Sequence, residues 1–414
     1  MANLAQRTSE DSWERGPLHG LRVLDVSTLF AGPLTATFLA DHGADVIKVE
    51  HPRGDGLRGM GWRVDETSLV WSVINRNKRC VTLDLHTPEG QQLFRRLAET
   101  VDVVIENFRP GTLDRWGLGY DVLSAANPGL ILLQVTAFGQ TGPWRDRPGF
   151  GTIAEAISGF AHINGYPDGP PTLPPFALGD AIAGVFGAAA VLSAAYRRAA
   201  TGRGQVIDLS IYEPLFWLLG PQVSVFDQLG EIQGRSGNHT PFTAPRSLFR
   251  TADGHWLAVS GSATSIAERL MRMVGRPDLI EQSWFGTAAG RLAHQAELDA
   301  PIEGWVAARP MREVMEVAEQ HEVAVGPILD VGDIAAHEQY LGRESIVRVP
   351  DGISGKPVAV QNVVPIFSES PSGHRWLGRS LGADDDAILG GEIGVDDADL
   401  ERFRAAGVIA SDPR

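Results

Sequence analysis

Short apolar segments alternate with amphipathic segments along the first half of the chain. Residues 21–27 (LRVLDVS) predict a buried strand, and the segment after them predicts a helix that begins with Pro33 at its first position and stops at Gly43. The next apolar run, residues 44–50, predicts a second strand. Two strands joined through a helix are expected to run parallel in one sheet.

The same alternation continues to residue 211. Residues 80–85 predict a strand, and the helix after it is expected to have Thr87 as its cap and Pro88 at its first position. The further elements predicted in this half are strands over 102–108, 130–138 and 205–211, a short helix over 152–160, a long helix that begins at Asp180, and an apolar helix over 212–229. This pattern is typical of an α/β fold with a doubly wound parallel sheet.

The pattern changes at residues 230–246, a polar segment rich in glycine and proline that predicts a domain boundary near residue 230. Beyond it, residues 247–259 predict a hairpin that turns at Asp253 and Gly254. The remaining predicted elements are helices over 262–275, 291–308 and 311–322, short strands over 345–351 and 356–361, and a last helix over 395–408. We therefore expect a smaller α+β domain over residues 230–329, after a tail of residues 1–18 and a larger domain that begins at residue 19.

Composition places the chain among ordinary globular proteins, since 43% of its 414 residues are hydrophobic and 21% are charged. The longest apolar run, residues 181–195, is shorter than the roughly 20 residues that cross a bilayer, so no membrane span is predicted. The first residues lack the apolar stretch of a secretory signal. The single cysteine, Cys80, fits a reducing compartment, and we expect a cytoplasmic protein.

The formal net charge of −15 argues against nucleic acid or an anionic membrane as a partner. A polyanionic ligand therefore needs a local basic site, and one basic cluster is present. It consists of Lys48, Arg53, Arg58, Arg63, Arg76, Lys78 and Arg79. From their spacing alone, a ligand site and a solvated charged surface remain equally open.

Several common kinds of chemistry lack their motifs. The loop after the first predicted strand, STLFAGP, has no G-x-G-x-x-G, which argues against a nicotinamide dinucleotide. The histidines, for example His239, His255 and His294, show no ligand-like spacing with cysteine or carboxylates, so no metal site is predicted. Neither a P-loop nor a G-x-S-x-G motif occurs.

Asp180 is a single carboxylate at the start of a long apolar run, in the sequence FALGDAIAG. One interpretation is structural, because an aspartate before a helix-forming segment is a good N-cap. The other is chemical, because a carboxylate that the positive end of a helix keeps ionised can act as a nucleophile. Among the small neighbours of Asp180, we expect Gly179 to give a substrate access and Gly187 to allow close helix packing. The residues alone leave both roles of Asp180 open.

Six segments occur together in an order that resembles the family III CoA-transferases, the group typified by formyl-CoA transferase and carnitine CoA-transferase. They are GLRVLDVSTLFAGP, GADVIKVEHPRGD, NRNKRCVTLDL, VIENFRPGTLDRWGLGY, FALGDAIAG and TGRGQVIDLSI, and the resemblance covers about residues 19–409. It implies a Rossmann-like large domain built from both chain ends, residues 19–229 and 330–414, with the smaller domain between them. It also implies two ring-shaped subunits interlocked as a homodimer.

The resemblance also implies a function and a set of site residues. Asp180 matches the family's catalytic aspartate, which forms a mixed anhydride with the donor acyl group and then a thioester with CoA, before an acceptor carboxylate takes over the CoA. The implied substrates are a CoA thioester and a small carboxylic acid, with no tightly bound cofactor and no metal. The residues expected to contact CoA are Phe30, Ala31, His51, Asn75, Arg76, Asn77, Lys78, Asn107, Phe108, Arg109 and Arg115.

Two alternatives share this fold. The α-methylacyl-CoA racemases need a second proton carrier, a histidine, where this chain has Phe150 followed by Gly151, and a phenylalanine cannot carry a proton. A catalytically silent acyl-CoA-binding homologue is disfavoured because Asp180 is present. We therefore predict a transferase. Its acceptor site is open: residues 233–246 lack the glycine run of formyl-CoA transferases, and Arg235, His239 and Arg246 either receive a small carboxylate or belong to a polar linker.

Overall fold

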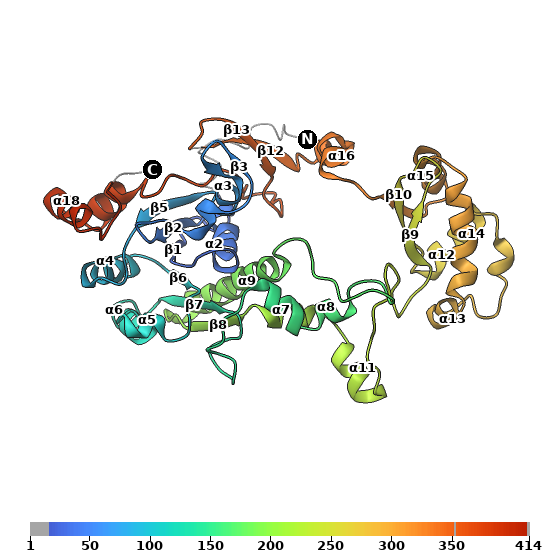
Figure 1. Cartoon of the computed structure of the whole chain (residues 1–414), viewed down its shortest axis with the longest axis horizontal. Coiled ribbons are helices and arrows are strands. Elements are labelled where there is room, and N and C mark those ends of the chain that lie inside the picture. Colours follow the sequence, from blue (N-terminus) through green and yellow to red (C-terminus); the bar gives the residue numbers. More distant parts are fainter. Residues whose placement is uncertain (1–15, 352, 412–414) are drawn as a thin grey trace. The chain divides into compact units, whose positions relative to one another are not determined.

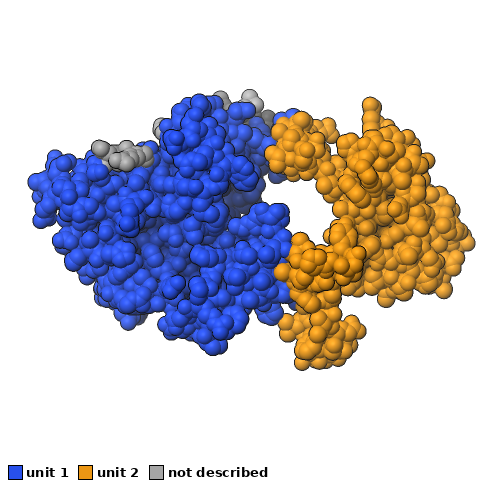
Figure 2. All heavy atoms as spheres, viewed as in Figure 1, with its two compact units in different colours: residues 1–160, 173–220, 341–414 blue, residues 161–172, 221–340 orange. Residues whose placement is uncertain are grey.

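The computed structural model describes residues 16–351 and 353–411, so most of the predicted tail over residues 1–18 lies outside the described residues. The chain forms two compact units, drawn in blue and orange in Figure 2. Unit 1 consists of Met1–Phe160, Leu173–Gly220 and Leu341–Arg414, and unit 2 of Ala161–Thr172 and Pro221–Tyr340. The predicted smaller domain, 230–329, falls within unit 2, which also includes residues 161–172, 221–229 and 330–340.

Unit 1 is built on a six-stranded sheet with the order β5-β2-β1-β6-β7-β8 (Figure 1). Its strands are β1 (Arg22–Asp25), β2 (Asp45–Glu50), β5 (Lys78–Thr82), β6 (Val103–Glu106), β7 (Ile131–Thr136) and β8 (Val206–Ser210). Every neighbouring pair is parallel, which confirms the predicted α/β fold. Counted along the chain, the order is 3-2-1-4-5-6, as in Rossmann folds, so the strand order reverses between β1 and β6.

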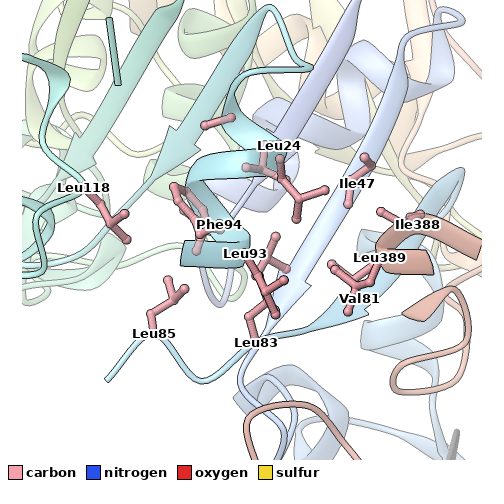
Figure 3. Packing of buried hydrophobic residues seen from close by; sticks show 14 of the residues in the cluster. Leu24, Ile47, Val81, Leu83, Leu85, Leu93, Phe94, Leu118, Ile388 and Leu389 are labelled. Carbon is pink, nitrogen blue, oxygen red and sulfur yellow. The ribbon is translucent and has the colours of Figure 1, made fainter. Parts of the chain in front are cut away.

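One face of this sheet is covered by α4 (Pro88–Ala98), α18 (Asp397–Ala405) and the π-helical segment η4 (Asp386–Glu392). Figure 3 shows side chains of α4, of η4 and of the strands in one apolar cluster, among them Leu24, Ile47, Phe94, Ile388 and Leu389. The Thr87 hydroxyl accepts a hydrogen bond from the Gly90 amide and Pro88 opens α4, as predicted. Burial of this cluster therefore stabilises the packing of the C-terminal η4 and α18 against the N-terminal strands.

The opposite face is covered by α2 (Ala31–Asp41) and α9 (Leu178–Thr201). A Cβ atom on Gly184 would lie 2.8 Å from the Leu34 Cβ, and one on Gly187 would lie 2.5 Å from the Thr35 Oγ1. Glycine at these positions lets the two helices approach closely, which confirms the packing role predicted for Gly187.

The starts and lengths of these two helices differ from the prediction. Helix α2 begins at Ala31, so Pro33 is its third residue and not its first. Helix α9 has 24 residues, and it alone of the helices in the described part of the chain is long and apolar enough to cross a membrane. Because α9 packs on α2 and on the sheet through buried small residues, we interpret it as a core helix.

The further elements of unit 1 and its borders are short. They are η2 (Gly56–Gly59), β3 (Arg63–Val64), β4 (Thr67–Ser68), α3 (Leu69–Ile74), α5 (Thr112–Arg115), α6 (Tyr120–Ala126), α7 (Gly151–Ile157), α8 (Phe160–Ile163), α10 (Tyr212–Leu218), α17 (Glu338–Gly342), β12 (Ile346–Pro350) and β13 (Pro357–Gln361). Strands β12 and β13 pair with each other as an antiparallel ribbon, so both short strands predicted there are confirmed.

Unit 2 contains an antiparallel sheet of β9 (Arg246–Arg250), β10 (Trp256–Ser260) and β11 (Ala324–Pro327). The hairpin of β9 and β10 is as predicted, with Gly254 at a positive φ of 88°, whereas β11 was not predicted. The helices are α11 (Gln222–Leu229), α12 (Thr264–Met273), η3 (Pro277–Leu279), α13 (Ala288–Ala293), α14 (Gln295–Ala307), α15 (Met311–Gln320) and α16 (Val331–Ala336).

Two predicted helices are each broken into two. The helix predicted over 212–229 is α10 and α11, because Gly220 adopts a φ of 63° and Pro221 follows it. The helix predicted over 291–308 is α13 and α14, which meet at His294. The first of these breaks coincides with the border between the two units.

Candidate active site

A cavity of about 590 Å³ opens in unit 1 where the strand order reverses. It is lined by loops that follow the carboxyl ends of β1, β6 and β7 and by the first turns of α2, α7 and α9. This edge of a doubly wound sheet is where such folds bind ligands. Of the predicted site residues, four line it: Phe30, Ala31, Asn107 and Asp180.

Asp180 is the third residue of α9, and the N-cap position is occupied by Ala177, so the predicted N-cap role of Asp180 is wrong. The amide of Gly179 in the same turn donates a hydrogen bond to the Glu155 carboxylate of α7, with 3.0 Å between nitrogen and oxygen. Glu155 is only 3% exposed. One free amide of the helix start, that of Gly179, is thus met by a carboxylate 24 residues upstream, and the half-buried Asp180 side chain lies on the cavity wall.

The first turns of α7 and α9 fit together through two glycines. A Cβ on Gly151 would lie 2.3 Å from Asp180 Oδ2, and a Cβ on Gly179 would lie 3.1 Å from the Gly151 carbonyl oxygen and 3.4 Å from Glu155 Cγ. Gly179 therefore serves close packing, and the access role predicted for it is wrong. Phe150, just before α7, is 63% exposed and lines the cavity. Its ring has no group that exchanges a proton.

The electrostatics of the cavity make Asp180 an unusual carboxylate. The pKa of Asp180 is raised to about 6, chiefly by burial and also by the negative charge of Glu155, while a hydrogen bond from the Gly151 amide acts in the opposite direction. Among the described residues that line the cavity, only Glu155 and Asp180 are charged. The other described lining residues are uncharged, and none of them is a histidine. Because its pKa is about 6, Asp180 is mostly ionised at neutral pH, and none of the described residues that line the cavity is a cation that could pair with it. An ionised carboxylate without a cationic partner can act as an oxygen nucleophile.

Asn107 holds the loop that forms the other wall. Its side-chain carbonyl accepts a hydrogen bond from the Thr28 amide at 2.8 Å, and its side-chain amide donates to the Thr28 carbonyl at 2.7 Å. Leu29, the next residue, has a positive φ of 63°, a backbone conformation that residues other than glycine rarely adopt. Asn107 thus ties the ends of β1 and β6 together and orients Phe30 and Ala31 at the cavity.

The predicted CoA contacts at residues 75–78 are not supported by the structure. Lys78 is fully buried, and its ammonium donates to Asp25 at 2.9 Å, to the Pro33 carbonyl at 2.9 Å and to Asn75 at 3.0 Å. Arg76 and Asn77 both bind Asp41, and Asn77 also donates to a backbone carbonyl. Strand β5 begins at Lys78, two residues before the predicted start, so these side chains lie at the amino end of the strand and are bound within the protein.

The basic cluster as a whole has mostly internal partners. Beside Lys78, the buried Lys48 lies 3.3 Å from Asp55 and 3.9 Å from Asp25. Burial opposes the ionisation of Asp25, yet the charges of Lys48 and Lys78 lower its pKa. The pairs made by the other members are Arg58 with Glu50, Arg63 with Glu66, Arg76 with Asp41, and Arg79 with Asp45 and Glu392. Six of the seven cations are therefore paired with carboxylates, which argues against the cluster as a polyanion site.

A second group of polar and aromatic residues lies at the carboxyl edge of the same sheet. His51 follows β2 and Asp84 follows β5, and Asp84 Oδ1 lies 3.7 Å from His51 Nε2 and 2.8 Å from His86 Nδ1. The His86 ring meets the edge of Trp116 with centroids 5.1 Å apart, and Trp116 meets Phe108 at 5.2 Å. This His51–Trp116 cluster, as we call these five residues, joins the predicted His51 and Phe108 with three residues that sequence reasoning missed.

The flanking arginines are exposed. Arg109 follows Phe108 directly, and Arg115, at the end of α5, donates to the Thr112 hydroxyl at 2.8 Å. Asp84, His86 and Trp116 lack a local sequence signal, because the fold alone brings the ends of β2 and β5 together. The ring nitrogens of His51 and His86 and an oxygen of Asp84 all lie within 4.8 Å of one another, a donor set that a transition metal accepts. Burial lowers the pKa of His51, which Asp84 partly offsets.

The candidate acceptor residues all have partners inside unit 2. His239 Nε2 lies 3.0 Å from Asp299 Oδ2, Arg235 donates to the Tyr166 carbonyl, and Arg246 donates to the Asn238 carbonyl. A cavity of about 400 Å³ on the sheet of unit 2 is lined by Arg246 but not by the other two. A role in acceptor binding therefore stays a prediction for these residues.

Comparison with known proteins identifies the family. The family model CoA-transferase family III matches residues 18–385. The chain belongs to the family III CoA-transferases. It is 41% identical over 395 residues to succinyl-CoA–D-citramalate CoA-transferase of Chloroflexus aurantiacus, covering 95% of this chain and 98% of that protein. The β subunit of succinyl-CoA–L-malate CoA-transferase from the same organism is 40% identical over 397 residues, with the same coverage.

Solved structures show the same fold. A CAIB/BAIF family protein from Brucella suis superimposes with a TM-score of 0.79 at 32% identity, covering 91% of this chain and 99% of that one. The protein is therefore an enzyme that transfers CoA between acyl-CoA thioesters and carboxylic acids, as the resemblance implied. In this CoA-transferase, the cavity that contains Asp180 and the His51–Trp116 cluster lie at the same edge of the sheet.

Proposed function

We propose that this CoA-transferase moves CoA from succinyl-CoA or a similar dicarboxylic thioester to a second small dicarboxylic acid, with Asp180 as the nucleophile. The observation that supports Asp180 as the nucleophile is its placement on a largely apolar cavity wall, with a pKa of about 6 and no cation among the described residues that line the cavity. The substrate class is supported by the relatives named for succinyl-CoA with citramalate or malate.

The chemistry proceeds through four exchanges at carbonyl carbons. An oxygen of Asp180 attacks the donor thioester, the carbon–sulfur bond breaks, and CoA leaves as a thiolate from the resulting mixed anhydride. The thiolate then attacks the Asp180 carbonyl carbon and releases the donor acid, which leaves an aspartyl-CoA thioester. The acceptor carboxylate attacks this thioester to form a second anhydride, and the thiolate finally attacks the acceptor carbonyl. Asp180 is regenerated as a carboxylate, with no net proton or electron transfer.

The nucleotide part of CoA is assigned to the opposite end of the same sheet edge. His51, Asp84, His86, Phe108 and Trp116 provide an aromatic and polar wall there. The exposed Arg109 and Arg115 supply charges for phosphate groups. Phe30, Ala31 and Asn107, which line the cavity, are assigned to the pantetheine arm between this wall and Asp180.

The decisive experiment looks for the covalent intermediate. Incubation of the enzyme with succinyl-CoA is expected to leave a hydroxylamine-sensitive adduct on Asp180, detected by mass spectrometry of the intact chain and its peptides. Asp180→Ala and Asp180→Asn remove the nucleophilic oxygen, so both are expected to lose the adduct and the exchange of CoA. Near-normal transfer by either variant would show that Asp180 is not the nucleophile.

The same preparation distinguishes the racemase alternative. Phe150 leaves one side of an α-carbon without a proton carrier. A 2-methyl-branched acyl-CoA incubated in deuterated water is therefore expected to keep its α-proton and its configuration. Fast α-deuteration without an acceptor acid would favour racemisation instead.

The assembly proposed for the enzyme is the interlocked homodimer that its family resemblance implies. Helix α11 supports an extended interface, because none of its described residues is buried and it exposes Val223, Phe226 and Leu229. We further place the enzyme in the cytoplasm, where the buried thiol of Cys80, whose pKa burial raises to about 12, stays reduced.

A further inference from the structure

Glu155 is a buried carboxylate that belongs to the cavity but has no part in the four exchanges above. It lies on α7, is 3% exposed, and lines the same cavity as Asp180. Its Oε1 accepts a hydrogen bond from the amide of Gly179, the residue immediately before Asp180. Glu155 therefore contacts the backbone that carries the nucleophile and also adds its charge to the cavity.

Within residues 16–351 and 353–411, no other charged group acts on Asp180 in a comparable way. The titratable residues on the elements packed against the first half of α9 are Asp41 on α2, Asp208 on β8, and Tyr212 and Glu213 on α10. Asp41 pairs with Arg76, Asp208 accepts from the Gln140 amide, and Glu213 accepts from the Ser210 hydroxyl. None of these four residues lines the cavity. The field at Asp180 is therefore dominated by Glu155.

The hydrogen bond to Gly179 does not by itself require a charge. A glutamine side chain presents a carbonyl oxygen that accepts the same bond, and it is much cheaper to bury than a carboxylate without a cation. The buried negative charge of Glu155 raises the free energy of the neighbouring Asp180 carboxylate. This repulsion disappears when Asp180 is acylated, since the anhydride and the thioester are neutral at that oxygen.

We propose that Glu155 is a positioning residue of the transfer reaction, which fixes the first turn of α9 through Gly179 and, through its charge, destabilises the free Asp180 carboxylate relative to the acylated forms. The inference rests on the proposed role of Asp180 as the nucleophile. Its consequence is that the identity of residue 155 sets the reactivity of residue 180 without touching the substrate's reacting carbon.

The test compares Glu155→Gln, which keeps the acceptor for Gly179, with Glu155→Ala, which removes it. Glu213→Gln is the matched control, because it neutralises a carboxylate on a helix that also packs on α9 but is outside the cavity. The ionisation of Asp180 is followed by NMR of protein labelled with γ-¹³C aspartate, with the signal assigned by its loss in Asp180→Asn. Turnover with succinyl-CoA is measured over pH 5 to 9.

Glu155→Gln is expected to fold normally and to lower the pKa of Asp180 by about one unit. The acidic limb of its pH–kcat profile shifts to lower pH by the same amount, because Asp180 must be deprotonated to act as the nucleophile. Above pH 7, where Asp180 is ionised in both proteins, kcat falls about three- to tenfold, because the less basic carboxylate is the weaker nucleophile. Glu155→Ala loses thermal stability as well, and Glu213→Gln changes neither readout.

Three results would overturn the inference: an unchanged Asp180 titration in Glu155→Gln, an unchanged acidic limb, or an unchanged kcat above pH 7. Glu155 would then be a structural cap only, with its effect confined to the stability of Glu155→Ala. The titration is read without substrate, so failure of the proposed function has a different signature. In that case the wild-type enzyme itself transfers no CoA, whatever the pKa of Asp180.

Discussion

Two of the three lysines of the chain are buried, and the third is exposed. Lys48 and Lys78 are fully buried around Asp25, whereas Lys356 pairs at 3.0 Å with Asp65 at the surface, where the two side chains are 64% and 70% exposed. A buried ion pair that loses one partner leaves an uncompensated charge in the interior. An exposed pair contributes little because water screens it.

These environments predict contrasting effects of the same substitution. Lys78→Met is expected to lower the free energy of unfolding by about 3 kcal/mol or more, and Lys356→Met by less than about 0.5 kcal/mol, both measured by guanidinium denaturation. The affinity of folded Lys78→Met for a CoA thioester is expected to stay near that of the wild type. A stable variant with weakened CoA binding would return Lys78 to the ligand site.

Site residues that lie in a recognisable sequence segment could be predicted. Site residues that are brought together only by the fold could not. Asp180, Asn107 and the Phe30–Ala31 pair were found from their segments, and all of them line the cavity. Glu155 was not assigned to a site, because its role depends on a contact with Gly179, 24 residues away, that no spacing along the chain indicates. His86 is a sequence neighbour of Asp84, but it was not assigned because the pairing of β2 with β5 is what brings His51 to the same carboxylate. Lys78 shows the opposite error, since a conspicuous cation in a motif proved to be internal.

At the scale of elements, the contact between α2 and α9 places Asp180 over the sheet. The Thr35 hydroxyl donates to the Gly184 carbonyl across this contact at 3.1 Å, and the glycines of α9 have no room for a side chain. Small residues thus set the distance between the two helices, and with it the width of the cavity that their first turns line.

Gly184→Ala is therefore expected to destabilise the enzyme by about 1–3 kcal/mol, because its Cβ would meet Leu34 at 2.8 Å. The matched control is Gly304→Ala in α14, where an added Cβ meets nothing within 4 Å. Alanine is the better helix former, so this control is expected to stabilise the protein by about 0.5–1 kcal/mol. Equal effects in thermal unfolding would contradict the packing role of Gly184.

The order and type of the six parallel strands followed from hydrophobic periodicity, whereas strand β11 and the limits of the elements did not. All six parallel strands lie on predicted segments, yet β5 starts two residues earlier than expected because Lys78 pairs with Val46 in the sheet. The break between α10 and α11 depends on Gly220 and Pro221, two residues inside an apolar run whose period continues through them. Tertiary pairing and single backbone conformations decide such limits, and periodicity averages over both.

At the scale of the whole molecule, the proposed homodimer has a direct test. Phe226→Asp combined with Leu229→Asp places two charges on the apolar side of α11, where both side chains are exposed within the single chain. Light scattering coupled to size exclusion is expected to find the wild type as a dimer and the double variant as monomer or aggregate. A monomeric wild-type enzyme, or a fully dimeric double variant, would remove α11 from the interface.

The described residues that line the Asp180 cavity include no cation, and this has a consequence for the order in which substrates arrive. A free enzyme presents two negative charges, Glu155 and Asp180, to any dianionic acid that approaches. Once Asp180 is the CoA thioester and the donor acid has left, only one of these charges remains, and the electrostatic barrier to the second acid is lower. Reaction with the donor therefore removes the negative charge that repels the acceptor acid. An acid that reaches the cavity before the donor has reacted is repelled by both carboxylates.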